Sequence, residues 1–267
     1  MKILSLNVWG GLVHGPLLAY LAAADADVCC LQEVSRAPAA RSDWLTYRDG
    51  DHVLQQRANL YREIKAALPA HEAFFCPTAR GALLDGDRPC PQEFGIATFV
   101  RETIPVLGQV QDFVHGAFSA DGFGPHPRAR NAHVLRLHDY GRGAAVTVAH
   151  LHGLRDPAGK GDTPARTAQA ERLVDLLDRV RRPGDALVVC GDFNVLPDSI
   201  SFDILGRIGL TDLVTGRGFT DTRTSHYGKS GRYADYLLVN AETPVAGFEV
   251  VAEPEVSDHR PLLLTIA

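Results

Sequence analysis

Several apolar, β-rich runs in this sequence stop on a polar side chain where a turn residue would be expected. The run VVC leads into Gly-Asp-Phe-Asn, so Asp192 and Asn194 follow a stretch that has the composition of a buried strand. A carboxylate at the end of a buried strand costs free energy unless something compensates its charge. Other runs end on or near a polar residue, or begin just after one, at Asn7, Glu33, His150, His152, Asp235 and Ser257-Asp258-His259.

The mixture of strand-like and helix-like segments indicates an α+β fold. Short β-rich runs punctuated by Gly and Pro dominate, which favours two packed sheets with helices on the outside. Two Gly/Pro-rich stretches, 77–92 and 116–130, are expected to be long loops. Helical periodicity predicts helices at about 16–24, 52–68, 163–182 and 199–207.

The length and composition of the chain limit its organisation and location. With 267 residues, 45% of them hydrophobic and 22% charged, we expect one domain over residues 1–267. The N-terminal run lacks the apolar core of a secretory signal, and no apolar run approaches the roughly 18 residues of a membrane span. We therefore expect a cytoplasmic protein without membrane contact, with all five cysteines, including Cys76 and Cys90, as free thiols.

The polar strand ends predict a common site. If the strands that begin with a polar residue run antiparallel to those that end on one, these side chains meet at one rim. Carboxylates gathered there repel one another and lose solvation, unless a cation is bound. Mg²⁺ commonly combines one or two carboxylates with water and substrate phosphate oxygens, and neighbouring histidines suit proton transfer. The constellation therefore predicts metal-assisted hydrolysis of a phosphoester.

Each of these residues also has an ordinary structural explanation when it is considered alone. An Asn or Asp at a strand end can close a turn through its own side chain, and Glu33 could be a solvated loop charge. These explanations do not account for the shared position of all these residues at strand ends.

Six segments together resemble the motifs of the endonuclease/exonuclease/phosphatase superfamily. They are LSLNVWG, LQEV, AHLHG, GDFN, DYLLV and SDHRPLL, in this order and over nearly the whole chain. The resemblance implies a four-layer α/β/β/α sandwich of two mixed sheets. It also implies a Mg²⁺-dependent phosphoric ester hydrolase, with Mn²⁺ as a substitute ion. Trp9 stands where apurinic/apyrimidinic endonucleases usually carry an acidic residue, which argues against abasic-site activity. The segment NVWGG is more similar to the sphingomyelinase-like and the uncharacterised bacterial branches, of which we favour the bacterial one.

The resemblance further implies roles for the carboxylates and amides. Glu33 is similar to the principal Mg²⁺ ligand of the family, and Asn7 and Asp258 are similar to residues close to the metal. Asp192 is similar to the residue that orients and deprotonates the attacking water. Asn194 beside it is similar to a phosphate-binding amide.

The histidines receive roles in the same way. His259 resembles the imidazole that bonds the scissile phosphoryl oxygen, and Asp235 resembles the carboxylate that orients it. His150 matches the position that contacts the phosphate or the leaving group. We take the side chains of His150 and His152 to point to opposite faces of their strand. His152 is then expected at the edge of the site, where it supports loop 154–162 or meets the leaving group.

The sequence leaves the identity of the phosphoester open. The formal net charge of −5 disfavours duplex DNA, so a small phosphoester is the expected substrate, with Arg130 and Arg155 as candidate substrate-binding cations. A nuclease acting on DNA or RNA is the alternative. An alternative from another class is an inactive binding module of the same fold. Such a module would be expected to have lost one or more of four residues that are all present here: Glu33, Asp192, Asp258 and His259.

Overall fold

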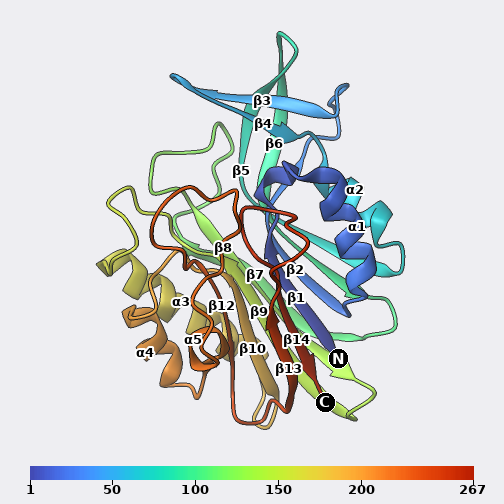
Figure 1. Cartoon of the computed structure of the whole chain (residues 1–267), viewed down its shortest axis with the longest axis vertical. Helices are drawn as coiled ribbons and strands as arrows, with labels where there is room; N and C mark the ends of the chain where they lie inside the picture. Colours follow the sequence, from blue (N-terminus) through green and yellow to red (C-terminus); the bar gives the residue numbers. More distant parts are fainter.

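The first sheet carries both ends of the chain and a projecting arm, which consists of residues 44–57 and 77–92. The structure, a computed structural model, describes residues 1–267 except for the side chains of Asp49 and His52. The strands of this sheet are β1 (Lys2–Asn7), β2 (Val28–Arg36), β3 (Trp44–Asp49), β4 (His52–Arg57), β5 (His71–Asp85), β6 (Arg88–Arg101), β13 (Val245–Val250) and β14 (Leu262–Ile266). Their order is β13-β14-β1-β2-β6-β5-β3-β4, and only β1 and β2 pair in parallel among the described strands of this sheet (Figure 1).

The second sheet is also mixed. Its strands are β7 (Val106–His115), β8 (Arg130–Asp139), β9 (Ala144–His152), β10 (Ala186–Asp192), β11 (Thr211–Asp212) and β12 (Asp235–Val239). Their order is β11-β12-β10-β9-β8-β7, with β9 and β10 parallel and the other neighbours antiparallel.

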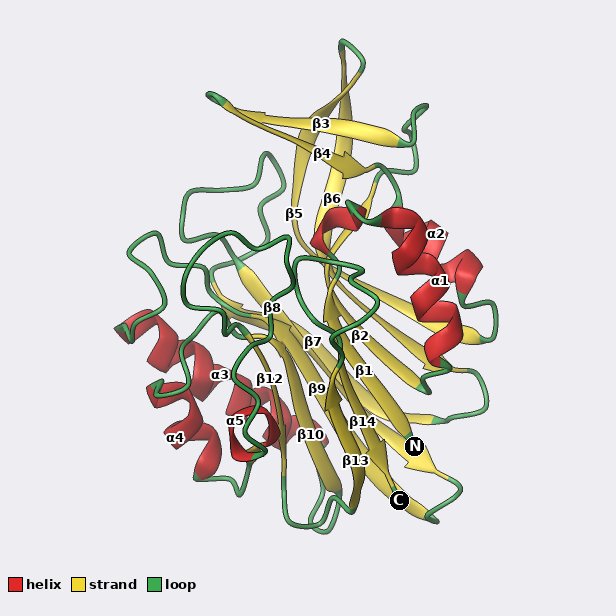
Figure 2. Cartoon of the chain, viewed as in Figure 1, coloured by secondary structure: helices red, strands yellow, loops and turns green.

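Helices cover the outer faces of the two sheets. They are η1 (Trp9–Gly11), α1 (His14–Ala24), α2 (Leu60–Ala67), α3 (Pro164–Val180), α4 (Ile200–Gly206) and α5 (Leu213–Gly216). Figure 2 shows α1 and α2 outside the first sheet and α3, α4 and α5 outside the second. The expected four-layer sandwich is therefore confirmed. Among the described residues, no helix is both long and apolar enough to cross a bilayer.

Strand alternation explains how β1 presents a polar group at the rim. Ile3 packs in the core between the sheets, whereas Leu4 and Leu6 pack with Leu17 of α1. Both faces of β1 are buried, so its sequence is almost entirely apolar. Because successive residues alternate between faces, Asn7 lies on the same face as Ile3 and emerges where the space between the sheets opens.

The expected meeting of strand starts and strand ends is confirmed. β12 runs antiparallel to β10, and the start of one pairs with the end of the other at Asp192 and Asp235. β14 likewise runs antiparallel to β1, so the segment 257–259 before β14 lies beside Asn7. One rim of the sandwich therefore collects these polar residues.

Two expectations about the arm are wrong. Residues 77–92 are not a loop but the far part of a long hairpin made by β5 and β6, which projects with β3 and β4 beyond the sandwich (Figure 1). Pro77 is tolerated there because it sits at a bulge, where a backbone N–H is not needed for pairing. The helix expected at 52–68 is restricted to α2, because residues 52–57 pair with β3.

The other sequence expectations about local structure agree with the chain. Thr163 caps α3 by accepting a hydrogen bond from the backbone N–H of Arg166. Residues 116–129 form an irregular connection, bridged to the β5 residues Ala79 and Arg80. All five cysteines are buried and free, although Cys76 and Cys90 lie in strands and not in irregular segments.

Candidate active site

A cleft of about 820 Å³ opens at the rim where the facing sides of the two sheets end. Asn7 and Asp235 are buried beside it and hydrogen-bond to groups that line it. Most of the expected site residues line it directly: Glu33, His152, Arg155, Asp192, Asn194, Asp258 and His259. Segments far apart in the sequence are thus brought together by the packing of one sheet on the other.

Asn7 joins the two carboxylates at the centre of this cleft. Its Nδ2 donates to Glu33 Oε1 at 3.1 Å and to Asp192 Oδ2 at 3.0 Å. The backbone N–H of Trp9 donates to Asn7 Oδ1 at 3.0 Å and orients the amide. The structure thus shows Asn7 as the residue that holds Glu33 and Asp192 together, and its expected place near a metal stays a prediction.

Glu33 reaches the cleft because β2 is bulged. The strand does not stop at Glu33, as the sequence suggested, but continues to Arg36 with a register shift between Leu31 and Val34. Gln32 faces the other sheet, so regular alternation would send Glu33 to the helix side. The bulge, with Glu33 at φ 60°, redirects its side chain to the rim at a cost on the order of 1 kcal/mol.

Asp192 is held by the turn that follows β10. Its Oδ1 accepts a hydrogen bond from the backbone N–H of Asn194, which adopts the left-handed conformation at φ 55°. Asn194 Nδ2 lies 3.4 Å from the carbonyl oxygen of Gly153. A Cβ on Gly153 would lie 2.4 Å from the carbonyl oxygen of Phe193, so only glycine allows the end of β9 to approach this turn.

His259 and Asp235 form a buried pair. Asp235 Oδ2 lies 2.8 Å from His259 Nδ1. Burial lowers the pKa of His259 to about 4 and raises the pKa of Asp235 to about 7. Arg223 donates from Nη1 to His259 Nε2, so the neutral ring carries its proton on Nδ1.

Arg223 is a site residue to which the pattern of strand ends gave no role. Its Nη1 also donates to Asp258 Oδ2 at 2.9 Å, and its guanidinium lies over the ring of Tyr227 at 4.3 Å. The segment that carries it forms an isolated bridge with His259. Arg223 belongs to no strand end, so the only available signal was the cluster of cations at 223–232.

The expected placement of the two β9 histidines is wrong. His150 and His152 lie on the same face of the strand, because residues two apart share a face. His150 is fully buried, with Nε2 at 2.8 Å from Thr98 Oγ1 and Nδ1 at 3.3 Å from Gln32 Nε2. His150 therefore lies in the core between the sheets and does not reach the rim.

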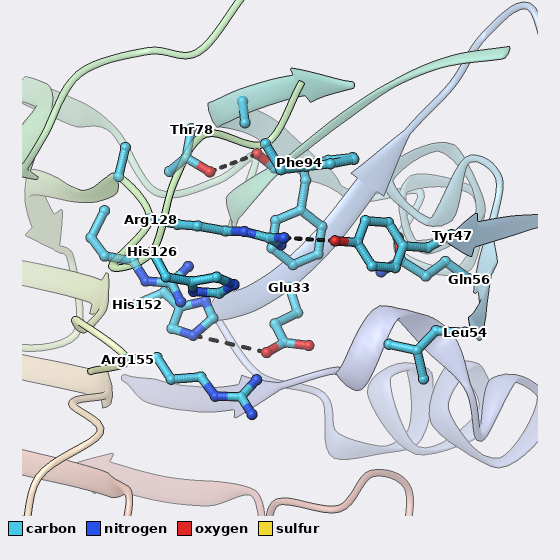
Figure 3. A pocket seen from close by; sticks show the side chains of 14 residues that line it. Glu33, Tyr47, Leu54, Gln56, Thr78, Phe94, His126, Arg128, His152 and Arg155 are labelled. Atoms are coloured by element: carbon cyan, nitrogen blue, oxygen red, sulfur yellow. Dashed lines mark hydrogen bonds and ion pairs between the residues drawn. The ribbon is translucent and has the colours of Figure 1, made fainter. Parts of the chain in front are cut away.

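His152 occupies the place expected for His150. Its Nε2 lies 3.8 Å from Glu33 Oε1 (Figure 3). The same atom lies 3.7 Å from Asp192 Oδ2. Burial, followed by the charge of Arg130, lowers the pKa of His152 well below its usual value. A neutral imidazole thus faces the central carboxylates from the second sheet.

The donor set at the rim fits a divalent cation. Burial raises the pKa of Glu33 and Asp258, so the protein alone does not compensate their charge fully. Oxygen ligands of this kind suit Mg²⁺ or Mn²⁺. Ligand atoms of Asp192, Asp235 and His259 also lie within 4.8 Å of one another. Asp235 is already paired with His259, and Asp258 uses Oδ2 for Arg223, so Glu33 is the better candidate ligand and Asp258 offers Oδ1 beside it.

The comparison with family models agrees with the fold. Two sheets packed between helices, with carboxylates and histidines gathered at one rim, place the chain in a class of α/β/β/α sandwiches whose members hydrolyse phosphoesters. The sequence matches the Endonuclease/Exonuclease/phosphatase family over residues 4–259. The chain belongs to this family.

Solved structures support the fold independently. A mannosyl-6-phosphatase of Bacteroides thetaiotaomicron has a TM-score of 0.69 at 16% identity, covering 100% of this chain and 99% of that one. A family member from Beutenbergia cavernae has a TM-score of 0.70 at 18% identity, with 100% and 71% covered. The human Nocturnin catalytic domain has a TM-score of 0.64 at 16% identity, with 100% and 93% covered. A search of curated proteins finds no match.

Proposed function

We propose that this protein is a divalent-metal-dependent phosphoesterase that hydrolyses a small phosphoester with a water activated by Asp192. The observation that carries the proposal is the convergence of Glu33, Asp192 and His259 on one cleft from both sheets. If these residues only closed turns at the ends of their strands, the three side chains would have no reason to line the same cleft. Their meeting is what hydrolysis needs: an anchored phosphoryl group and a base within reach of a water.

The proton transfers are assigned to the protein's own side chains. Asp192 faces the cleft with Oδ2 near two imidazoles and is the candidate base for the attacking water. An anionic phosphoryl group near His259 would favour the protonated imidazolium, whose Nδ1 donates to Asp235. Its Nε2 would then donate to the phosphoryl oxygen in place of accepting the hydrogen bond from Arg223. We assign His152 to contact with the phosphate or the leaving group, because its Nε2 lies near Glu33 and Asp192.

The metal would be held by Glu33 and Asp258, with Asn7 close by. When bound, a divalent cation supplies positive charge to the phosphoryl oxygens as negative charge develops on them. Asn7 fixes the separation of Glu33 and Asp192 through its two hydrogen bonds. Asn7 thereby holds Glu33, the expected metal ligand, at a fixed distance from Asp192, the expected base.

A small substrate is favoured over a polynucleotide. The net charge of −5 provides no general attraction for a phosphate backbone. The mannosyl-6-phosphatase among the similar structures acts, by its name, on a phosphorylated sugar. A nuclease remains the alternative within this reaction class.

The test is a panel of phosphoesters assayed with Mg²⁺, Mn²⁺ and no metal. It contains bis(p-nitrophenyl) phosphate, sugar phosphates, inositol phosphates, nucleotides, phospholipids, and DNA and RNA oligomers. We expect metal-dependent turnover of at least one small phosphoester and its loss in Asp192→Asn. Asp198→Asn is the matched control, because it makes the same change at an exposed residue in the turn between β10 and α4.

Two outcomes would contradict the proposal. Turnover of oligonucleotides alone would favour the nuclease. Absence of turnover across the panel with any metal would favour an inactive binding module.

A further inference from the structure

A side pocket adjoins the cleft beneath the arm. It has a volume of about 180 Å³ and lies between β3, the β5–β6 hairpin and the connection 116–129. Glu33, His152 and Arg155 line both the side pocket and the cleft, so the two spaces are continuous (Figure 3). The space is several times the roughly 30 Å³ share of one water molecule, which is enough for a ligand group.

Arg130 is the unusual residue of the side pocket. Its side chain is buried, with 7% of the residue exposed. Within the part of the chain that the structure describes, its guanidinium makes no hydrogen bond and no ion pair within 4 Å, and its Nε is buried without a partner. Burial lowers its pKa to about 10, although Glu33 and Asp192 oppose this effect. A buried cation without a partner is costly, and an anionic ligand is the usual compensation.

Two more guanidinium groups line the same space. Arg128 donates from Nη2 to Tyr47 Oη at 2.7 Å (Figure 3). Its guanidinium also lies over the rings of Tyr47 and Phe123. Arg155 is exposed at the mouth shared with the cleft. Among the described residues, Glu33 is the only carboxylate that lines the side pocket. The gathered positive charge therefore exceeds the local negative charge.

The side pocket is distinct from the place assigned to the scissile group. Asp192, Asn194 and His259 line the cleft but not the side pocket. Arg128 and Arg130 line the side pocket but not the cleft. A ligand whose scissile group lies beside Asp192 can therefore extend past Glu33 to a second cationic region.

We propose that the side pocket binds a second phosphate group of the substrate, so that the preferred substrate is a small bisphosphorylated compound. This inference rests on the proposed function for the scissile group only. Arg130 and Arg128 would form charge-assisted hydrogen bonds to the second phosphate. The rings of Tyr47, Phe94 and Phe123 would contact the body that joins the two phosphates.

The test compares matched substrates that differ by one phosphate. With Mg²⁺ present, kcat/KM is measured for glucose 1,6-bisphosphate against glucose 6-phosphate, and for adenosine 3′,5′-bisphosphate against adenosine 5′-phosphate. We expect a preference of roughly tenfold or more for the bisphosphate in at least one pair. The reason is that one hydrogen bond between charged groups typically changes an affinity by about this factor or more. In Arg130→Gln, the preference should fall to within about threefold of unity. The exposed Arg207→Gln should retain it.

A binding measurement separates this inference from the proposed function. The Asp192→Asn protein is titrated calorimetrically with each compound, with and without Arg130→Gln. Tighter binding of the bisphosphate that depends on Arg130 supports the pocket even if no variant hydrolyses anything. Hydrolysis of monophosphates without a bisphosphate preference overturns the pocket and leaves the proposed function intact.

The thermal stability of Arg130→Gln also tests the inference. Replacing an unpaired buried charge by a neutral side chain is expected to leave Tm unchanged or to raise it when no anion is present. A large fall in Tm would show that Arg130 has a structural role and would contradict the inference. Arg128→Gln provides the second variant, and it should also reduce the bisphosphate preference. An unchanged preference in both variants overturns the proposal.

Discussion

Asn7 at the end of β1 donates a hydrogen bond of 3.0 Å to Asp192 at the end of β10, which lies in the other sheet and 185 residues further along the chain. The same amide donates to Glu33. One side chain therefore fixes the relative position of two carboxylates that the proposed reaction uses differently. The first prediction separates their roles.

Glu33→Gln should weaken Mg²⁺ binding by tenfold or more, roughly, because a ligand carboxylate is lost. Asp192→Asn should leave the metal affinity within about threefold and lower the rate by roughly 10²-fold or more, because a base is lost. Calorimetry and steady-state kinetics on both variants measure the two effects. Equal loss of metal affinity would place the ion against Asp192, as the spacing of Asp192, Asp235 and His259 also permits.

The two β9 histidines should separate activity from stability. His152→Ala is expected to lower the rate by roughly 10²-fold with little change in Tm, because it faces Glu33 and Asp192. His150→Ala should destabilise the fold by roughly 2–4 kcal/mol, since it leaves a cavity and removes a partner of Thr98. Denaturant unfolding and kinetics of both variants test this. A larger loss of rate than of stability in His150→Ala would contradict the placement.

His133 should make the fold sensitive to acid. It is buried between Thr98 and Gln109, and burial lowers its pKa to about 4 from the ordinary 6.5. Between pH 6.5 and 4, His133 is protonated in the unfolded chain but remains neutral in the native state. The free energy of unfolding is therefore unaffected by this residue above pH 6.5 and decreases as the pH falls towards 4. The loss at pH 4 amounts to about 3 kcal/mol.

Unfolding of the wild type and of His133→Gln between pH 7 and 4 measures this contribution. The variant should lose less stability than the wild type over this range, whereas His115→Gln on β7 should follow the wild type. Parallel pH profiles for all three proteins would show that His133 is protonated in the native state.

Arg166 should hold the loop beside the cleft. This fully buried side chain donates to the carbonyl oxygens of Gly159, Gly161 and Asn194. Arg166→Met should lower stability by roughly 3 kcal/mol or more, because the buried carbonyl groups of Leu154 and Asn194 lose a donor. Hydrogen exchange over 154–162 should become faster. Arg179→Met, on the same helix but exposed, is the control, and equal exchange in both variants would refute the role.

The sequence by itself determined the layers of the fold and most of the polar groups at the rim. Both rest on local chemistry. Apolar runs of strand length must be buried, and a carboxylate or amide at their ends must lie where it can find polar partners at the edge of the core. For this reason Asn7, Asp192 and Asp235 could be placed at one rim before their partners were known.

Only the tertiary structure determined the positions of side chains that depend on the opposite sheet or on irregular backbone. The bulge in β2 redirects Glu33, and a run of apolar letters contains no signal for a bulge. His150 and His152 share a face, so what distinguishes them is depth, which is set by where Gln32 and Thr98 of the first sheet cover β9. Alternation along a strand is a local property, but the end of the covered region depends on how two sheets pack.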